Sequence, residues 1–243
     1  MVDTARLAVW SGPRNISTAL MRAWENRSDT VVVDEPLYAH YLAVTGLDHP
    51  GREEVVATGE TDWRVVVESL LAPLTGGTRV FYQKHMAHHL ISDVGRGWIS
   101  GMTNVLLIRD PREVVASYIR SRDHVTADDI GLRQQTILYD DLSAAGAPPL
   151  VIDAADLLGD PEHFLRRLCD LVGVAFDERM LHWPPGPRDS DGVWAPHWYA
   201  AVWESTRFTP YHKREVVLSG EPARVAGECA PLYERLAARR WKG

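Results

Sequence analysis

Five short runs of β-branched and apolar residues alternate along the chain with stretches whose apolar residues recur at helical spacing. The runs are residues 6–11, 30–34, 79–83, 104–109 and 149–153. The helical stretches are 17–26, 62–72, 111–121, about 126–145, 161–173 and 222–238. Strands that alternate with helices indicate βαβ units and a largely parallel sheet. We therefore expect a three-layer α/β fold, a central and mostly parallel sheet flanked by helices, with its site at the carboxyl ends of the strands.

The pattern changes over residues 183–212, which are rich in Pro, Gly and aromatic residues and predict one long ordered loop. Four of the nine tryptophans lie in 21 residues of it: Trp183, Trp194, Trp198 and Trp203. Long loops inside a compact domain tend to be functional, so we expect an aromatic lid over a ligand. The open alternative is a small apolar core packed beneath the loop.

Length and charge narrow the class of protein. The 243 residues suit one domain over 1–243, and the formal net charge of −7 argues against general nucleic-acid binding, which needs many Lys and Arg residues. We find no apolar stretch long enough to cross a bilayer and no signal peptide. We therefore expect a cytoplasmic monomer or homodimer with no membrane or nucleic-acid partner. A local group of arginines can still bind a small anion.

Residues 9–20, VWSGPRNISTAL, pass from a predicted strand through a Gly-Pro turn into a helix. The first N–H groups of a helix have no partner within it and bind anions well. Arg14 adds a charge, and Ser17 and Thr18 add hydroxyl donors. The sequence leaves open a plainer reading, in which Ser17 caps the helix and Arg14 is solvated. The segment has neither the second glycine nor the lysine of a Walker A loop, which disfavours Mg-ATP chemistry.

A second segment, VLLIRDPREVVASYI at 105–119, is again a strand, a proline-started turn and a helix, with Arg109 and Ser117 eight residues apart. Together, PRNIST (13–18) and RDPREVVASY (109–118) resemble the paired motifs of the P-loop-type sulfotransferases that use 3′-phosphoadenylyl sulfate (PAPS). The resemblance includes DEPL (34–37), QKHM (83–86) and residues 156–181, and covers most of 5–182. It implies sulfuryl transfer from PAPS, which becomes adenosine 3′,5′-bisphosphate, to a hydroxyl or amine of a small-molecule acceptor.

The resemblance also implies the residues that bind the cosubstrate. It assigns the 5′-phosphosulfate to the first motif, Arg14, Asn15, Ser17 and Thr18, and the 3′-phosphate to Arg109 and Ser117, with Arg207 as a further candidate. Guanidinium groups pair well with phosphate oxygens. Arg109 could instead form a structural ion pair with Asp110 or Glu113. No metal is required for this chemistry, because Arg14 and the helix terminus can stabilise the developing charge.

The acceptor's proton needs a base. The resemblance places the catalytic histidine at His85, and a histidine of near-neutral pKa can accept a proton at physiological pH. Lys84 is either an aid to the leaving phosphate or a surface charge. Glu35, at the end of the second strand, is the alternative base, or forms a salt bridge or cap.

The histidines of YQKHMAHH also permit a metal site formed by His85, His88 and His89. No HExxH or cysteine pattern accompanies them, so we expect no metal and treat His88 and His89 as surface or packing residues. Two other functions stay open: another P-loop group-transfer or nucleotide-hydrolysing enzyme, and a non-catalytic nucleotide-binding partner subunit.

Overall fold

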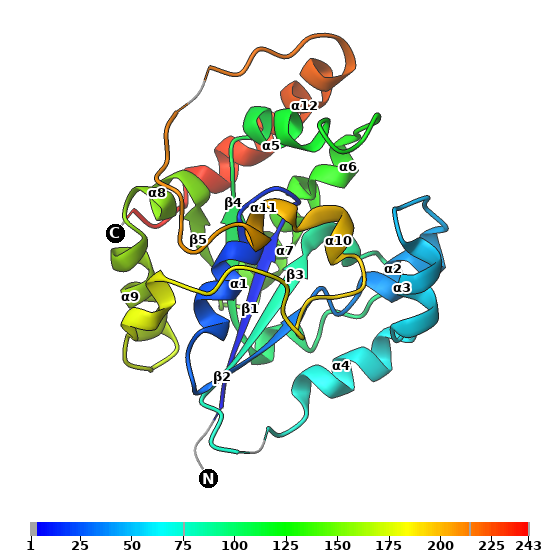
Figure 1. Cartoon of the computed structure of the whole chain (residues 1–243). Coiled ribbons are helices and arrows are strands. Elements are labelled where there is room, and N and C mark those ends of the chain that lie inside the picture. The colour runs from blue at the N-terminus through cyan, green and yellow to red at the C-terminus, as the bar shows by residue number, and fades with distance from the viewer. Residues whose placement is uncertain (1–3, 75, 214, 243) are drawn as a thin grey trace.

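The central feature of the computed structural model, which describes residues 4–74, 76–213 and 215–242, is a parallel sheet of five strands. Their order across the sheet is β2-β3-β1-β4-β5 (Figure 1). The strands are β1 (Ala5–Ser11), β2 (Thr30–Asp34), β3 (Val80–Met86), β4 (Thr103–Ile108) and β5 (Leu150–Asp153). The parallel sheet that the sequence predicts is confirmed, and β1 lies at its centre.

Helices cover both faces of the sheet and form a separate core on each. One face packs against α1 (Ser17–Glu25), α8 (Ala154–Gly159) and α9 (Pro161–Leu171). The other packs against α4 (Trp63–Leu71), α5 (Pro111–Tyr118), α7 (Leu132–Ala144) and α12 (Gly220–Ala237). Alternate residues of each strand point to opposite faces, so β1 contributes Leu7 and Val9 to the first core and Ala8 and Trp10 to the second. The layers are those of the expected three-layer fold.

Two helix starts follow directly from an Asp-Pro pair. The side chain of Asp110 accepts a hydrogen bond from Arg112 N at 2.8 Å before α5, and that of Asp160 accepts one from His163 N at 3.1 Å before α9. Proline at the first helical position has no N–H to leave unpaired, and the aspartate satisfies one that follows. These local signals explain why both helices begin where the sequence predicts.

Shorter helices lie around the sheet. They are α2 (Tyr38–Thr45), α3 (Arg52–Thr58), α6 (Ala127–Ile130), α10 (Ala195–Trp198) and α11 (Ala200–Trp203), with 3₁₀ turns η1 (Ala87–His89), η2 (Ile99–Gly101) and η3 (Glu178–Leu181). The helix expected over about 126–145 is two helices, because Gly131 between them adopts a left-handed φ of 76°. Within the described residues, no helix combines the length and apolar character needed to cross a membrane.

Gly12 allows the turn after β1 to pass close to α6. A Cβ on Gly12 would lie 2.1 Å from the carbonyl oxygen of Ile130, so any side chain there would displace the backbone. This contact fixes the position of the β1–α1 turn. The two cysteines, Cys169 and Cys229, are buried and unpaired, and burial raises the pKa of each thiol to about 11. A thiol with such a pKa stays protonated and unreactive near neutral pH.

Candidate functional site

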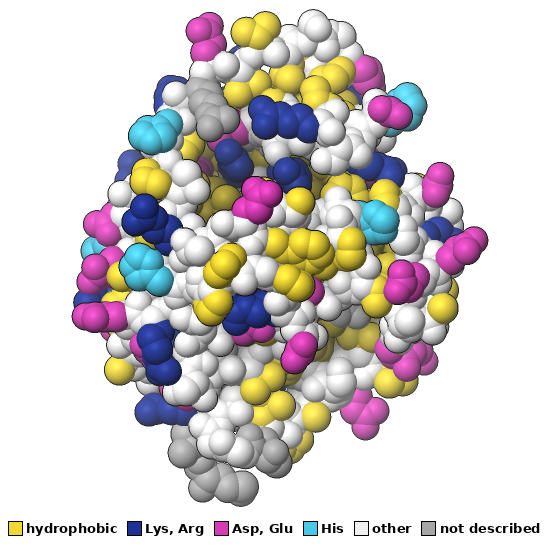
Figure 2. Space-filling view, in the orientation of Figure 1, with side chains coloured by type: hydrophobic (Ala, Val, Ile, Leu, Met, Phe, Trp, Pro, Cys, Tyr) yellow, Lys and Arg dark blue, Asp and Glu magenta, His cyan; other side chains and the backbone are white. Residues whose placement is uncertain are grey.

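A cavity of about 310 Å³ lies at the carboxyl ends of the strands. Its walls come from the β1–α1 turn and the start of α1 (13–19), from the ends of β2, β3 and β4, from α5, and from parts of 198–209. Figure 2 shows Lys and Arg side chains gathered in the upper half of this face, in the region where Figure 1 places α10, α11 and α5. Because β3 and β4 both pair with β1, residues far apart in sequence meet at this edge.

The backbone at the cavity is strained. Among the described non-glycine residues, three have a positive φ: Arg14 at 60°, Ile16 at 59° and Glu35 at 44°. Each costs about 1–3 kcal/mol, and such strain persists where the surrounding structure holds it, commonly at functional sites. Ile16 is the N-cap of α1 and supplies no side-chain hydrogen bond to the helix. The N–H groups at the start of α1 are therefore left to meet a ligand.

Arg14 is a half-buried cation without an acidic partner in the described chain. Its Nε donates to Ser117 Oγ at 2.9 Å, so the two predicted motifs are in direct contact. Burial lowers the pKa of Arg14, and the nearby charges of Arg109 and Arg120 lower it further. Guanidinium groups held close together without a carboxylate for Arg14 favour a bound anion.

Arg109 both lines the cavity and forms the ion pair considered from the sequence. Its Nε and Nη2 lie 2.9 and 2.8 Å from Glu113 Oε2, and its Nη1 donates to the carbonyl oxygen of Arg14 at 3.0 Å. The second possible partner, Asp110, caps α5 instead. Glu113 orients Arg109, whose side chain remains 24% exposed and can still reach a ligand.

The other predicted cosubstrate residues lie at the same cavity. Asn15, Ser17 and Thr18 line it beside Arg14, and Arg207 lines it from the aromatic segment. The side chain of Asn15 donates to the carbonyl oxygen of Leu107 at 3.3 Å, which ties the turn after β1 to β4. Seven positions named from the sequence for this role are thus brought together: Arg14, Asn15, Ser17, Thr18, Arg109, Ser117 and Arg207.

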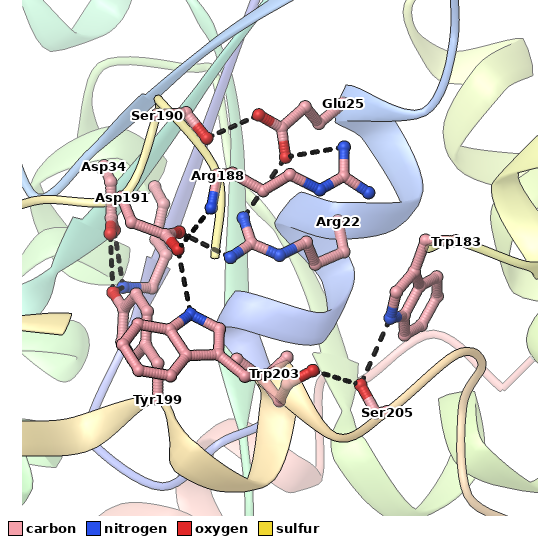
Figure 3. Close-up of polar contacts among 12 residues, drawn as sticks. Arg22, Glu25, Asp34, Trp183, Arg188, Ser190, Asp191, Tyr199, Trp203 and Ser205 are labelled. Carbon is pink, nitrogen blue, oxygen red and sulfur yellow. Dashed lines mark hydrogen bonds and ion pairs between the residues drawn. The ribbon is translucent and has the colours of Figure 1, made fainter. Parts of the chain in front are cut away.

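Lys84 forms the centre of a buried charge cluster, which consists of Asp34, Glu35, Lys84 and Tyr199. Its Nζ lies 2.7 Å from Asp34 Oδ1 and 2.6 Å from Glu35 Oε1, and donates to the Tyr199 hydroxyl at 2.7 Å. That hydroxyl donates to Asp34 Oδ2 at 2.6 Å (Figure 3). Lys84 is 1% exposed, which overturns the reading of it as a surface charge.

Two carboxylates share one lysine in this cluster, and the surroundings shift the pKa values of Lys84 and Glu35. Burial lowers the pKa of Lys84, but Asp34 and Glu35 outweigh it and raise the pKa well above its ordinary value. Burial raises the pKa of Glu35, with Asp34 adding to the rise and Lys84 opposing it. Glu35 and Lys84 line the cavity. A carboxylate with a raised pKa at a cavity wall is suited to accept a proton.

His85 lies outside this charge cluster and does not line the cavity. β3 continues to Met86, three residues beyond the predicted end, so Lys84 and Met86 face the cavity while His85 points to the opposite side of the sheet. Its ring stacks on Trp10 at 4.1 Å, and burial, then Lys84, lowers its pKa to about 3. The geometry therefore corrects the expectation of His85 as the base: an imidazole so placed cannot reach a ligand in the cavity.

His88 and His89 are buried in η1 and line the cavity, so of the two expected alternatives the surface position is wrong and the packing position holds. Among the residues that the structure describes, no three His, Cys, Asp or Glu side chains are grouped as metal ligands. The sequence also missed Tyr199, which lines the same cavity. Its position depends on the packing of short helices that no motif marks.

The segment 183–212 is a wall of the cavity rather than one irregular loop. It contains α10 and α11, and Trp198 is the one of its four tryptophans that lines the cavity in the described chain. Asp191 ties the segment to α1: Arg22 Nη2 lies 2.5 Å from Asp191 Oδ1, and Trp203 Nε1 donates to Oδ2 at 3.0 Å (Figure 3). These contacts hold α10 and α11 over the site.

Comparison with known proteins gives one family for nearly the whole chain. The family described as "Sulfotransferase domain" matches residues 5–236. Two curated relatives come from Arabidopsis thaliana. Branched-chain-amino-acid aminotransferase-like protein 1 is 40% identical over 209 residues, and protein 2 of that name is 35% identical over 228 residues. The matches cover 86% and 93% of this chain but 37% and 40% of the relatives, so the chain spans about two fifths of their length.

Solved structures share the fold. The sulfotransferase domain of the Synechococcus PCC 7002 olefin synthase superimposes with a TM-score of 0.54 at 15% identity, covering 94% of this chain and 95% of that one. The sulfotransferase domain from the curacin biosynthetic pathway gives 0.52 at 15% identity, covering 94% and 98%. A sulfotransferase from Alicyclobacillus acidocaldarius gives 0.52 at 13% identity, covering 98% and 96%. At such identities the likeness concerns the fold.

Proposed function

The chain belongs to the sulfotransferase domain family, and from that premise we propose that it transfers a sulfuryl group from PAPS to a hydroxyl or amine of a small-molecule acceptor. The observation that carries the proposal is a single cavity lined by two chemically distinct groups of residues. Arg14, Arg109 and the uncapped start of α1 supply an anion site, and the Glu35–Lys84 pair lies at the adjacent strand end.

The residues present fit a donor with two anionic ends. The start of α1, Arg14, Ser17 and Thr18 would hold the 5′-phosphosulfate, and Arg109 and Ser117 the 3′-phosphate, with Arg207 on the same wall. The contact of Arg14 with Ser117 supports two anion sites that lie next to each other. PAPS supplies an activated sulfuryl group on a phosphate leaving group. The chain's part is to hold this charge with fixed cations and N–H groups.

Glu35 is the base we propose in place of His85. The acceptor oxygen forms a bond to sulfur, the bond from sulfur to the 5′-phosphate oxygen breaks, and the acceptor's proton moves to the Glu35 carboxylate. Lys84 holds Glu35 in place at 2.6 Å. The raised pKa of Glu35 makes it a stronger proton acceptor than an ordinary carboxylate, at the cost of being ionised over a narrower pH range.

Calorimetry tests the donor site directly. We expect adenosine 3′,5′-bisphosphate to bind more tightly than adenosine 5′-monophosphate, because Arg109 and Ser117 add contacts for the second phosphate. It should also bind more tightly than ATP with Mg²⁺, since the first motif lacks the Walker A lysine. Tighter binding of Mg-ATP, followed by its hydrolysis, would instead support the nucleotide-hydrolysing alternative.

Replacing Arg109 by alanine should weaken adenosine 3′,5′-bisphosphate binding about 10- to 100-fold, the loss expected for hydrogen bonds between charged groups. Titration calorimetry measures it. The matched control is Arg166→Ala, because Arg166 forms the same kind of i,i+4 pair, with Glu162, on the exposed face of α9. Equal affinity in the wild type and both variants would show that Arg109 forms only a structural ion pair with Glu113 and does not bind the nucleotide.

His85→Leu should leave the transfer rate within a few-fold of the wild type while changing the thermal midpoint. The ring packs against Trp10 and Trp98 on the far face of the sheet, so its loss affects packing and the contact with Gln83. Paired measurements of kcat and thermal unfolding separate the two effects. A collapse of kcat in a stable variant would restore His85 as the base.

A further inference from the structure

The cavity has a second end, walled by aromatic and imidazole rings. Tyr38 at the start of α2 stacks on His89 with ring centroids 4.6 Å apart, and His89 lies 4.4 Å from His88. The hydroxyl of Tyr38 is paired with His49 Nδ1 at 2.9 Å. All four residues line the cavity, as does Trp198. They meet because η1 directly continues β3 beyond Met86 and packs against α2.

The histidines of this end follow β3, whereas the proposed 3′-phosphate residues follow β4. In the sheet order, β4 carries Arg109 on one side of β1, and β3 leads to His88 and His89 on the other. The start of α1 stands between them, after β1, and Lys84 and Glu35 stand at the ends of β3 and β2. An acceptor that approaches a sulfuryl group held at the start of α1, with its hydroxyl near Glu35, would therefore extend toward His88 and His89.

His88 and His89 keep unused hydrogen-bonding capacity. They are 8% and 2% exposed, and the Nδ1 atom of each is buried without a partner. Among the cavity-lining residues that the structure describes, Asn15 is the other with such an atom, and it lies at the donor end. Buried polar atoms are nearly always paired, so two rings that line one cavity and each keep an unpaired nitrogen are the candidates to bind a polar group of a ligand there.

The imidazole rings at this end are neutral near pH 7. Burial lowers the pKa of His88 to about 4, burial lowers that of His89 well below its ordinary value, and burial also lowers that of His49. The charged residues lining the described cavity are Arg14, Arg109 and Arg207 at the donor end and the Glu35–Lys84 pair between the ends. Two charged residues act on this end from behind the wall, Asp129 on His88 and Arg122 on His49, but neither lines the cavity. A carboxylate or an ammonium group placed against His88 and His89 would therefore meet no opposite charge in the lining there, and its desolvation would cost binding energy.

We propose that this end is the acceptor subsite, and that it takes an uncharged, largely apolar acceptor with a second neutral hydrogen-bonding group, which His88 and His89 bind. A neutral imidazole has one N–H and one acceptor nitrogen, so the pair can recognise a hydroxyl, carbonyl or amide. The aromatic walls hold the apolar skeleton. This inference rests on the proposed function for the identity of the ligand as acceptor, but the binding preference can be measured by itself.

The test compares four probes built on one phenol: meta-hydroxybenzyl alcohol, its apolar isostere meta-ethylphenol, the anion meta-hydroxybenzoate and the cation meta-hydroxybenzylamine. Dissociation constants are measured by ligand-observed NMR at pH 7.5, with and without adenosine 3′,5′-bisphosphate. We expect the alcohol to bind about three- to tenfold more tightly than each of the other three, the gain of one or two neutral hydrogen bonds.

Substitutions test whether His88 and His89 cause the tighter binding of the alcohol. His88→Leu and His89→Leu should each reduce the advantage of the alcohol over meta-ethylphenol, and His88→Asn should restore part of it, because an asparagine amide can replace Nδ1. His85→Leu is the matched control, since it removes a histidine of the same segment from the opposite face. That variant should keep the wild-type preference.

The outcomes distinguish the proposed acceptor subsite from the proposed sulfuryl transfer. Equal binding of all four probes, a preference for a charged probe, or a preference that survives both leucine variants overturns the subsite. A neutral preference that depends on His88 or His89 supports it even if adenosine 3′,5′-bisphosphate fails to bind, and that failure would count against the proposed function alone.

Discussion

Glu35→Gln should lower kcat for sulfuryl transfer by about 100- to 10,000-fold, the usual contribution of a positioned general base. Glutamine keeps the size of the side chain and can still accept a hydrogen bond from Lys84, but it cannot take a proton from the acceptor. Affinity for adenosine 3′,5′-bisphosphate should change little, because the arginines that we propose to bind the nucleotide are Arg14 and Arg109, which form no contact with Glu35. Initial rates and titration calorimetry on the same preparation measure both quantities.

Asp34→Asn is the matched control for this variant. It removes the same charge from the same cluster, in which Asp34 contacts Lys84 and Tyr199. Unlike Glu35, however, Asp34 does not line the cavity. We expect its loss of kcat to be much smaller than that of Glu35→Gln. Equal losses would mean that the charge of the cluster matters and that Glu35 is not the base.

The pH profile gives a separate check on Glu35. A general base must be ionised, so kcat should fall on the acid side as Glu35 gains a proton. Because burial raises the pKa of Glu35, this fall should occur above about 4.3, the ordinary pKa of a glutamate. The acid limb should be absent from the residual activity of Glu35→Gln. If the acid limb persists in Glu35→Gln, it reports the titration of a different residue and not of Glu35.

Lys84→Met should reduce the free energy of unfolding by about 3–5 kcal/mol, the cost of removing one partner from a buried ion pair. Methionine fills similar space, but Asp34 and Glu35 would remain in a buried site without a cation. Denaturant unfolding monitored by tryptophan fluorescence measures the loss. It should be smaller at pH 5 than at pH 8, because without Lys84 the folded carboxyls have raised pKa values and stability falls as pH rises through them.

A double variant distinguishes loss of charge balance from loss of packing. In the wild type, Asp34→Asn should destabilise the protein, because it removes a partner of Lys84 and a hydrogen-bond acceptor of Tyr199. In the Lys84→Met background the same substitution should stabilise it, since it removes an unpaired buried carboxylate. If Asp34→Asn destabilises both backgrounds, the lysine acts mainly through packing.

The predicted ends of the helices and strands agree with the structure where a local signal marks them and differ where it is absent. β2 has the predicted bounds, and α5 and α9 begin where an Asp-Pro pair marks them. The end of β3 was missed because Lys84 and His85 are polar, and polarity usually marks the end of a strand. Here the carboxylates beside Lys84 and the stacking of His85 on Trp10 make burial of both residues possible. Those partners come from other strands, so a local pattern does not contain them.

The sequence by itself determined the alternation of strands and helices, the parallel sheet and the two strand-to-helix turns with Arg14 and Arg109, because these follow from local periodicity and from residues near one another in the chain. Only the tertiary structure decided which side chains share the cavity. The alternation of β3 turned Lys84 toward the ligand and His85 away from it, and the packing of α10 and α11 brought Tyr199 to Asp34 and Glu35. Such contacts join residues up to 165 positions apart. They depend on how strands pair and helices pack, which no short stretch of sequence specifies.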